Sequence, residues 1–173
     1  MTITINFSKE EIDQCMKFAE EVVNETFDRF KQNKKTRTER IFFGKLGELI
    51  FLNYLKSIGL SPKVEDMFKV FPGIINADKF DFVTKSGKKI DIKTAYEKYH
   101  KRILVPYDQF ENEKAKDYYV GIKVNLNEFS AKIMGFCDKE KLEQNKKIDF
   151  GEGLAYWEYL DNLKAIGELI NLL

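Results

Sequence analysis

The segment from Phe80 to Thr94 constrains the fold more than any other part of the sequence. It contains two short runs of alternating apolar and polar residues, FDFVT and KIDIKT, separated by Lys85-Ser86-Gly87. Alternation with a period of two is typical of β-strands that bury one face. A three-residue hairpin loop favours glycine at its third position, where the backbone is left-handed, and Gly87 stands there. The segment therefore predicts an antiparallel hairpin.

The length of the loop determines which side chains share a face of this hairpin. A three-residue loop pairs Thr84 with Lys88 and, counting outwards, Asp81 with Asp91. Asp81, Asp91 and Lys93 then emerge on one face. The opposite face carries the apolar residues Phe80, Phe82, Ile90 and Ile92. A two-residue loop would shift the register by one residue and send the two carboxylates to opposite faces.

Two carboxylates opposite each other point to a bound cation. Like charges across a strand pair are destabilising, by on the order of 1 kcal/mol at an ordinary surface. A divalent cation between Asp81 and Asp91 removes that cost, and Mg²⁺ needs only one or two protein carboxylates. Lys93, on the same face, is placed to orient a water or to neutralise charge on a phosphate. The alternative is a solvated hairpin face on which these residues have no function.

A buried helix supplies a further carboxylate. Residues 41–58 are apolar on nearly every side, which predicts a largely buried helix, and Gly59 is a suitable residue to end it. Glu48 lies within this apolar surface. A buried carboxylate requires a metal, a hydrogen bond or a cationic partner. Glu48 therefore either completes the hairpin site, or pairs with Lys45 one turn earlier, or bends its side chain out to solvent.

The remaining elements indicate an α/β fold with a central mixed β-sheet flanked by helices. Ser8 and Glu11 form a capping box, and the apolar spacing that follows predicts an N-terminal helix within residues 8–32. Further strands are expected at 118–124 and 131–136. Asp138 is expected to start a short helix, and helical spacing returns near the C-terminus. We expect one domain over 1–173, with a core at 40–137 and a helical segment at 138–173.

The order of these residues resembles the PD-(D/E)XK nuclease superfamily, which includes restriction endonucleases, Holliday-junction resolvases and repair exonucleases. A helix carries Gly47-Glu48, Asp81 follows on one strand, and Asp91-Ile92-Lys93 follows on the next. The resemblance covers about residues 40–124. Phe80 stands where the pattern that names the superfamily has proline.

The resemblance implies a restriction-endonuclease-like core and Mg²⁺-dependent hydrolysis of DNA phosphodiester bonds, with Mn²⁺ as a possible substitute. Asp81, Asp91, the backbone carbonyl of Ile92 and Glu48 would bind the metal, and Lys93 would be the catalytic lysine. A homodimer is expected by analogy. Gln109 lacks a tyrosine four residues later, and a cysteine set is missing. Both absences favour a restriction-like or structure-selective endonuclease. The alternative is a catalytically inactive nucleic-acid-binding or protein-interaction module on the same fold.

Local charge, rather than overall charge, must supply any nucleic-acid contacts, because the formal net charge is only +1. Two basic segments are the expected contacts: Lys34, Lys35 and Arg37 in one, and Lys98, His100, Lys101 and Arg102, interleaved with Tyr96 and Tyr99, in the other. Basic and aromatic residues together suit a nucleic-acid backbone and its bases. The alternative for both segments is solvated surface.

The sequence also indicates a soluble, cytoplasmic protein. The N-terminal residues contain no basic region followed by an apolar stretch, so no signal peptide is expected. No apolar run is long enough to span a bilayer. Cys15 and Cys137 are too few for a zinc or iron–sulfur site and are interpreted as small buried residues.

Overall fold

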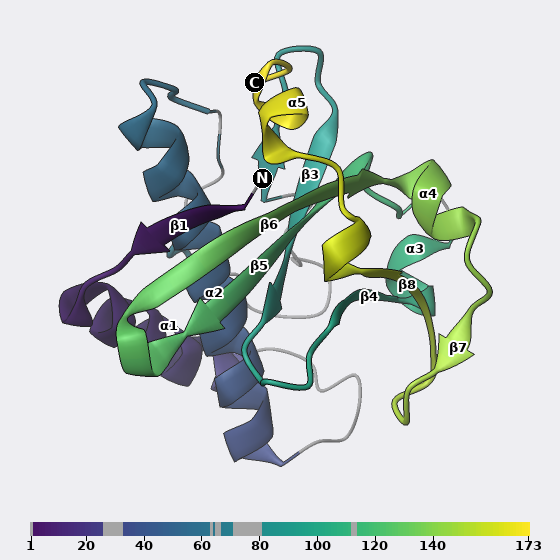
Figure 1. Ribbon diagram of the computed structural model, residues 1–173. Helices are drawn as coiled ribbons and strands as arrows, with labels where there is room; N and C mark the ends of the chain where they lie inside the picture. Colours follow the sequence, from purple (N-terminus) through teal and green to yellow (C-terminus); the bar gives the residue numbers. More distant parts are fainter. Residues whose placement is uncertain (1, 26–32, 63, 65–66, 71–80, 112–113) are drawn as a thin grey trace.

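The chain folds as a mixed α/β structure with a curled, mixed β-sheet and helices (Figure 1). The computed structural model describes residues 2–25, 33–62, 64, 67–70, 81–111 and 114–173. The larger sheet has the strand order β1-β6-β5-β3-β2 and is formed by β1 (Ile3–Asn6), β2 (Phe82–Val83), β3 (Lys89–Ala95), β5 (Tyr118–Asn125) and β6 (Ser130–Asp138). Strands β3 and β5 run parallel, and the other pairs are antiparallel.

A second, three-stranded sheet lies beside the first and has the order β4-β8-β7. Its strands are β4 (Arg102–Pro106), β7 (Ile148–Asp149) and β8 (Leu154–Tyr159). The helices are α1 (Lys9–Glu25), α2 (Lys34–Ser57), α3 (Tyr107–Phe110), α4 (Lys139–Glu143) and α5 (Ile166–Ile170), with 3-10 turns η2 (Leu126–Glu128) and η3 (Leu160–Asn162).

Helix α2 crosses one face of the larger sheet and forms the centre of the main core (Figure 1). Its fully buried residues include Leu46, Ile50 and Leu55. They belong to the same apolar cluster as the inward-facing residues of β2, β3, β5 and β6: Phe82, Ile90, Val120, Ile122 and Ile133. The nearly uniform apolar surface of α2 therefore reflects contact with the sheet on one side and with α1 on the other.

Local capping signals position the helices as the sequence predicts. Glu11 Oε2 accepts from the Ser8 backbone N–H at 2.8 Å, and Ser8 Oγ accepts from the Glu11 N–H at 3.2 Å. This reciprocal pair confirms the capping box at the start of α1. At the start of α4, Asp138 Oδ1 accepts from the Lys141 N–H at 2.9 Å, which confirms the predicted start of that helix.

The second helix begins earlier than expected. We predicted residues 41–58, but α2 starts at Lys34, where the side chain of Asn33 accepts from the Thr36 N–H at 2.9 Å. The basic segment with Lys35 and Arg37 is therefore part of a helix rather than a linker. The polar character of these residues hid their helical geometry, because they extend beyond the buried part of α2 into solvent.

The C-terminal segment 138–173 is not simply helical, and that prediction was wrong. It contains α4 and α5, but β7 and β8 lie between them. Strand β8 pairs along its length with β4, from Arg102 opposite Tyr159 to Pro106 opposite Ala155. The long-range partner decided the conformation, because alternating aromatic residues suit a strand once another strand is available to pair with it.

A smaller core fills the space beside the second sheet and contains Ile103, Val105, Phe110, Leu142 and Tyr156. Gly121 on β5 allows the chain to pack closely there, since a Cβ at this position would lie 2.6 Å from Leu163 Cδ1 and 2.8 Å from Leu160 Cδ2.

Two sequence expectations about environment are met in part. Cys15 and Cys137 are free and buried, as expected for small apolar residues. Within the described ranges, no helix combines the length and apolar character that a membrane crossing requires.

Candidate active site

The hairpin that carries Asp91 and Lys93 has the predicted loop. Gly87 has a φ of 83°, and the Thr84 N–H donates to the Lys88 carbonyl at 2.9 Å. Farther along, Phe82 pairs with Ile90. The register predicted from the glycine position is therefore confirmed as far as Phe82. Residues 71–80, including Phe80, lie outside the described part of the chain.

Asp81 departs from the regular pairing that we predicted. The ladder ends at Phe82, and the Asp81 N–H instead donates to the Ile90 carbonyl at 3.0 Å. The Asp81 carboxylate accepts from the Ile92 N–H at 2.6 Å. In a regular strand pair, a backbone carbonyl of the neighbouring strand would accept this hydrogen bond instead. Asp81 is thus held beside β3 by hydrogen bonds rather than standing as the cross-strand partner of Asp91.

Asp91 and Lys93 lie together on the side of β3 opposite to Ile90 and Ile92. Nζ of Lys93 is 2.7 Å from Oδ2 of Asp91, and each side chain is 20% exposed. The two charged groups are in contact, but their geometry is not that of a hydrogen bond. Oδ2 of Asp91 is buried and accepts no hydrogen bond within the described residues. The Lys93 ammonium is therefore the charge that compensates for burying this oxygen, although the contact leaves the oxygen without a hydrogen bond.

Helix α2 approaches β3 most closely at Gly47, next to Glu48. A Cβ at Gly47 would overlap Oγ1 of Thr94 and would lie 3.4 Å from Cγ2 of Ile92. Only glycine therefore lets the helix backbone rest against this part of β3. Glu48 follows directly, so the same contact brings its carboxylate towards the strand that carries Asp91.

The Glu48 carboxylate is paired with Lys45, which is the alternative that the sequence left open. Nζ of Lys45 lies 2.6 Å from Oε2 of Glu48, and the two side chains are 6% and 15% exposed. The same ammonium lies 4.8 Å from the centre of the Phe18 ring on α1. Pairing and a cation–π contact together compensate for burying a lysine in the main core.

Asp81 lies close enough to Glu48 and Asp91 for their charges to affect it. The pKa of Asp81 is raised well above its usual value, first by burial and then by the negative charges of Glu48 and Asp91. The Ile92 N–H and the charge of Lys93 oppose this increase. The repulsion that we expected between Asp81 and Asp91 is therefore present, and Glu48 contributes to it.

As they stand, these side chains do not form a ready metal cage. Among the residues that the structure describes, no three His, Cys, Asp or Glu side chains are gathered closely enough to hold a metal ion. Two of the carboxylates are instead paired with lysines, Glu48 with Lys45 and Asp91 with Lys93.

Lys116 is a further charged residue at this site that the sequence reasoning missed. Its backbone N–H donates to the Tyr119 hydroxyl at 2.9 Å, and Tyr119 is the direct β5 partner of Asp91. Burial lowers the pKa of Lys116, while Asp91 and Asp81 are the carboxylates that oppose this effect. A parallel pairing of β3 with β5 is needed to bring Lys116 here, and no local sequence pattern predicts it.

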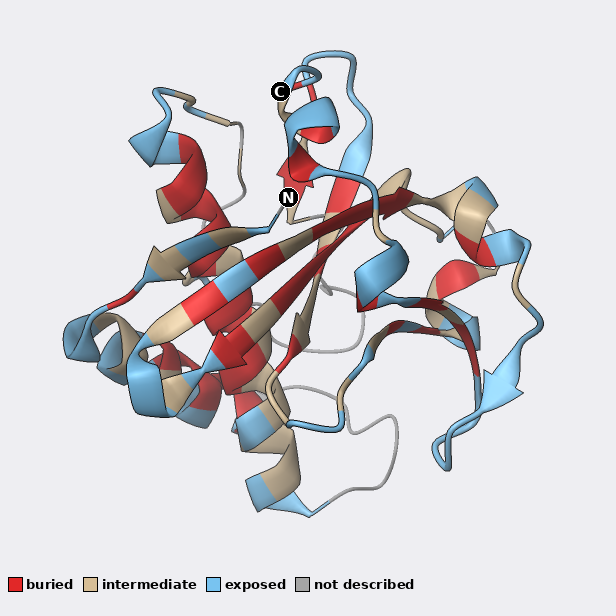
Figure 2. Cartoon of the chain, in the orientation of Figure 1, coloured by how far each residue is buried: buried red, intermediate tan, exposed pale blue. Residues whose placement is uncertain are grey.

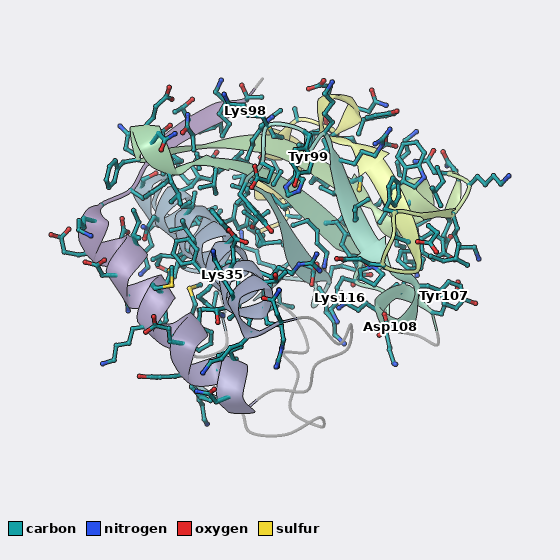
Figure 3. The ribbon with its side chains drawn as sticks, turned by 90° about the horizontal axis from the view of Figure 1, so that it is seen from below. Lys35, Lys98, Tyr99, Tyr107, Asp108 and Lys116 are labelled. Atoms are coloured by element: carbon teal, nitrogen blue, oxygen red, sulfur yellow. The ribbon has the colours of Figure 1, made fainter. Side chains whose placement is uncertain are left out.

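Lys34, one of the expected nucleic-acid contacts, lies far from Glu48. Lys34 starts α2, about 20 Å from Glu48 along the helix at 1.5 Å per residue. Lys34 and Lys35 line a pocket of about 620 Å³ between α1 and α2, together with Glu20 and Glu39. Figure 3 shows Lys35, Lys98 and Lys116 on three separate parts of the surface.

The loop with His100 is ordered by the histidine itself. Nδ1 of His100 accepts from the backbone N–H groups of Tyr96 and Glu97, at 3.3 and 3.2 Å. The Tyr96 ring stacks on Phe43 of α2, with 3.9 Å between ring centres. Burial lowers the pKa of His100, and the positive charge of Arg40 adds to this effect. His100 is therefore a neutral acceptor within the loop, while Lys98 and Lys101 are exposed.

Comparison of the chain with family models, with curated proteins and with solved structures finds no match. The geometry above is therefore the basis for assigning a function.

Proposed function

We propose that this chain is a Mg²⁺-dependent nuclease that hydrolyses DNA phosphodiester bonds, with Asp81, Asp91, Lys93 and Glu48 as its active site. The proposal includes a restriction-endonuclease-like core, with Mn²⁺ as a possible substitute metal. The observation that carries it is Oδ2 of Asp91, a buried carboxylate oxygen that contacts the Lys93 ammonium at 2.7 Å and accepts no hydrogen bond from the described residues. Burial, and then the negative charges of Glu48 and Asp91, raise the pKa of Asp81.

The donor set fits a hard divalent cation. Asp81 and Asp91 offer carboxylate oxygens, the Ile92 carbonyl is on the strand between Asp91 and Lys93, and Glu48 is on the adjoining helix. Mg²⁺ prefers oxygen ligands and keeps several waters, so it needs few protein side chains. When bound, the ion would lower the pKa of a water and neutralise charge on the phosphate.

Two lysines pair with carboxylates of the site. Lys93 is held at Asp91 by charge and is only 20% exposed. Once Asp91 is neutralised by a cation, the Lys93 ammonium is free to contact a phosphate oxygen or a water. Lys45 holds Glu48 in the same way. Each of these two lysines thus stands where a cation would otherwise be required, and Asp81 is the carboxylate without such a pair within the described residues.

The element order supports the same proposal. The helix with Glu48 packs on β3, β3 follows the turn after Asp81, and β5 runs parallel to β3. This is the order on which the sequence resemblance to the superfamily depends.

Cleavage assays test the proposal directly. Supercoiled, linear, branched and single-stranded DNA are incubated with the protein in Mg²⁺, in Mn²⁺ and in EDTA. We expect metal-dependent cleavage that falls by several orders of magnitude in Asp91→Asn and in Lys93→Ala, because metal and lysine act on one transition state. Lys132→Ala, an exposed lysine on β6, is the matched control and should cleave like the parent.

Two results together would contradict the nuclease proposal. If no form of DNA or RNA is cut with either metal, and Asp91→Asn unfolds the protein, then Asp91 is structural and the nuclease proposal fails.

The absence of a gathered ligand set among the described residues favours a second candidate, an inactive nucleic-acid-binding module. That candidate predicts DNA binding of equal strength in Mg²⁺ and in EDTA, with no cleavage in either.

A further inference from the structure

The second sheet has one buried face and one partly exposed face. Its buried face contains Ile103, Val105, Tyr156 and Glu158. Residues directly opposite each other in β4 and β8 share a face, and Arg102 pairs with Tyr159 while Leu104 pairs with Trp157. We call the set Arg102, Leu104, Trp157 and Tyr159, with Phe150 from the turn after β7, the outer face.

The outer face is apolar and open to solvent. Leu104 is 38% exposed, Tyr159 is 37% exposed and Phe150 is 38% exposed. Figure 2 shows the exposed colour over β7 and the turn that leads into β8. Aromatic residues grouped on one exposed sheet face, rather than scattered singly, indicate a binding surface.

Arg102 lies among the rings of this face. Its guanidinium carbon is 4.4 Å from the centre of the Tyr159 ring, 5.1 Å from that of Trp157 and 5.6 Å from that of Phe150. One guanidinium nitrogen donates to the Tyr159 hydroxyl at 2.7 Å. No carboxylate of the described residues forms an ion pair with Arg102, so an aromatic surface carries an uncompensated positive charge.

Lys146 and the turn after β7 border the outer face. Trp157 Nε1 donates to the carbonyl of Lys146, an exposed residue. Two acidic residues lie close by: Glu152, in the turn after β7, is paired with a cation, whereas the exposed Asp149, at the end of β7, binds backbone N–H groups and keeps its charge. Glu152 accepts from Arg40 of α2 at 2.7 Å, and Asp149 accepts from the N–H groups of Gly151 and Gly153.

We propose that the outer face binds single-stranded nucleic acid, with unpaired bases stacked on Trp157 and Tyr159 and phosphates contacting Arg102 and Lys146. Open sheet faces with aromatic and basic residues suit this ligand, because every base has a flat apolar face and every nucleotide a charge. A duplex hides the faces of its bases. An apolar protein partner would bury Arg102 without an acidic group. The site is separate from the carboxylates, and binding there requires no metal.

Intrinsic fluorescence reports on this site directly, because Trp157 is the only tryptophan of the chain. The full chain is titrated in EDTA with oligo(dT) and with an abasic oligomer of the same length. Stacking of a base on the indole quenches its emission, so oligo(dT) should quench Trp157 and the abasic oligomer should not. Because no metal is present and no cleavage is measured, the result does not depend on the nuclease proposal.

Variants locate the binding. Tyr159→Leu and Arg102→Gln keep the tryptophan and should each weaken oligo(dT) binding by about fivefold to a hundredfold, the range found when a stacking residue is removed. Tyr107→Leu, which removes another exposed tyrosine of the same domain surface, is the matched control and should bind like the parent. Circular dichroism and thermal unfolding confirm that each variant is folded.

Several results would overturn the proposal: no oligo(dT) binding, binding without quenching, equal quenching by the abasic oligomer, or unchanged affinity in both variants. Sedimentation provides a further check. A dimer of the parent that Tyr159→Leu dissociates would assign the outer face to a second copy of the chain instead of nucleic acid.

Discussion

Asp81 is the residue whose protonation most affects the candidate site. Its pKa in the folded protein is raised by burial and by Glu48 and Asp91. Between the unfolded value of 3.8 and this raised value, the folded state binds more protons than the unfolded state. Stability should therefore fall as pH rises through that window. At neutral pH the ionised carboxylate is a cost that a bound cation would remove.

Asp81→Asn should therefore stabilise the metal-free protein at pH 7, by on the order of 1 kcal/mol. Asparagine retains an oxygen that can accept from the Ile92 N–H but carries no charge. Urea unfolding in EDTA at pH 4 and pH 7 measures the effect, which should be largest at pH 7. Added Mg²⁺ should stabilise the parent more than the variant. An Asp81→Asn protein less stable than the parent at pH 7 would contradict the inferred repulsion.

His100 should make stability depend on pH in the opposite direction. Its neutral Nδ1 accepts two backbone hydrogen bonds, and its pKa is lowered in the folded state. The unfolded chain then binds the proton more readily, so this contribution is complete above the unfolded pKa of 6.5 and is lost as pH falls below it. The chain has one histidine, so NMR of its imidazole gives a single titration. A midpoint above 6.5 would show that the loop does not require a neutral ring.

At the level of elements, the contact between α2 and β3 positions Glu48. Gly47→Ala should displace the helix from β3, because the new methyl group overlaps Thr94 Oγ1. We expect a loss of roughly 1 kcal/mol or more in the free energy of unfolding, together with a loss of cleavage. Thermal unfolding and the cleavage assay are measured on the same preparation.

The same helix offers a matched control for this substitution. A Cβ at Gly44, three residues earlier, would have nothing within 4 Å. Gly44→Ala should therefore be neutral or should stabilise α2 by up to about 1 kcal/mol, since alanine is the better helix former. Adding Thr94→Ala to Gly47→Ala should restore part of the lost stability. Equal effects of the two glycine substitutions would show that the close approach at Gly47 is unimportant.

At the scale of the whole molecule, the basic residues are divided among separate regions rather than gathered in one cleft. Replacing Lys34 and Lys35 with alanine, and separately Lys98 and Lys101, tests whether either group binds duplex DNA. Each lysine–phosphate interaction that a variant removes should reduce the slope of log affinity against log salt by about 0.9. Salt titrations of binding in EDTA measure this slope. An unchanged slope in both double variants would identify these lysines as solvated surface.

The sequence by itself determined the features that depend on neighbouring residues. Gly87 specified the hairpin loop, because a left-handed position strongly favours glycine, and the loop in turn specified the pairing of Phe82 with Ile90. Ser8 and Asp138 marked helix starts for the same reason, since a cap needs only a side chain and the next turn of backbone. The chemistry of Asp91 and Lys93 on one side of β3 followed from this local register.

The tertiary structure decided what depends on residues far apart in the chain. Strand β8 exists because β4 pairs with it, and Arg102 meets Tyr159 only through that pairing. The sequence predicted a helical segment over 138–173, which includes β8. The hydrogen bond from the Ile92 N–H to the Asp81 carboxylate holds Asp81 in place, just beyond the end of the β2–β3 pairing. Local patterns cannot predict such contacts, because the free energy of a buried hydrogen bond or ion pair depends on which groups the whole fold brings together.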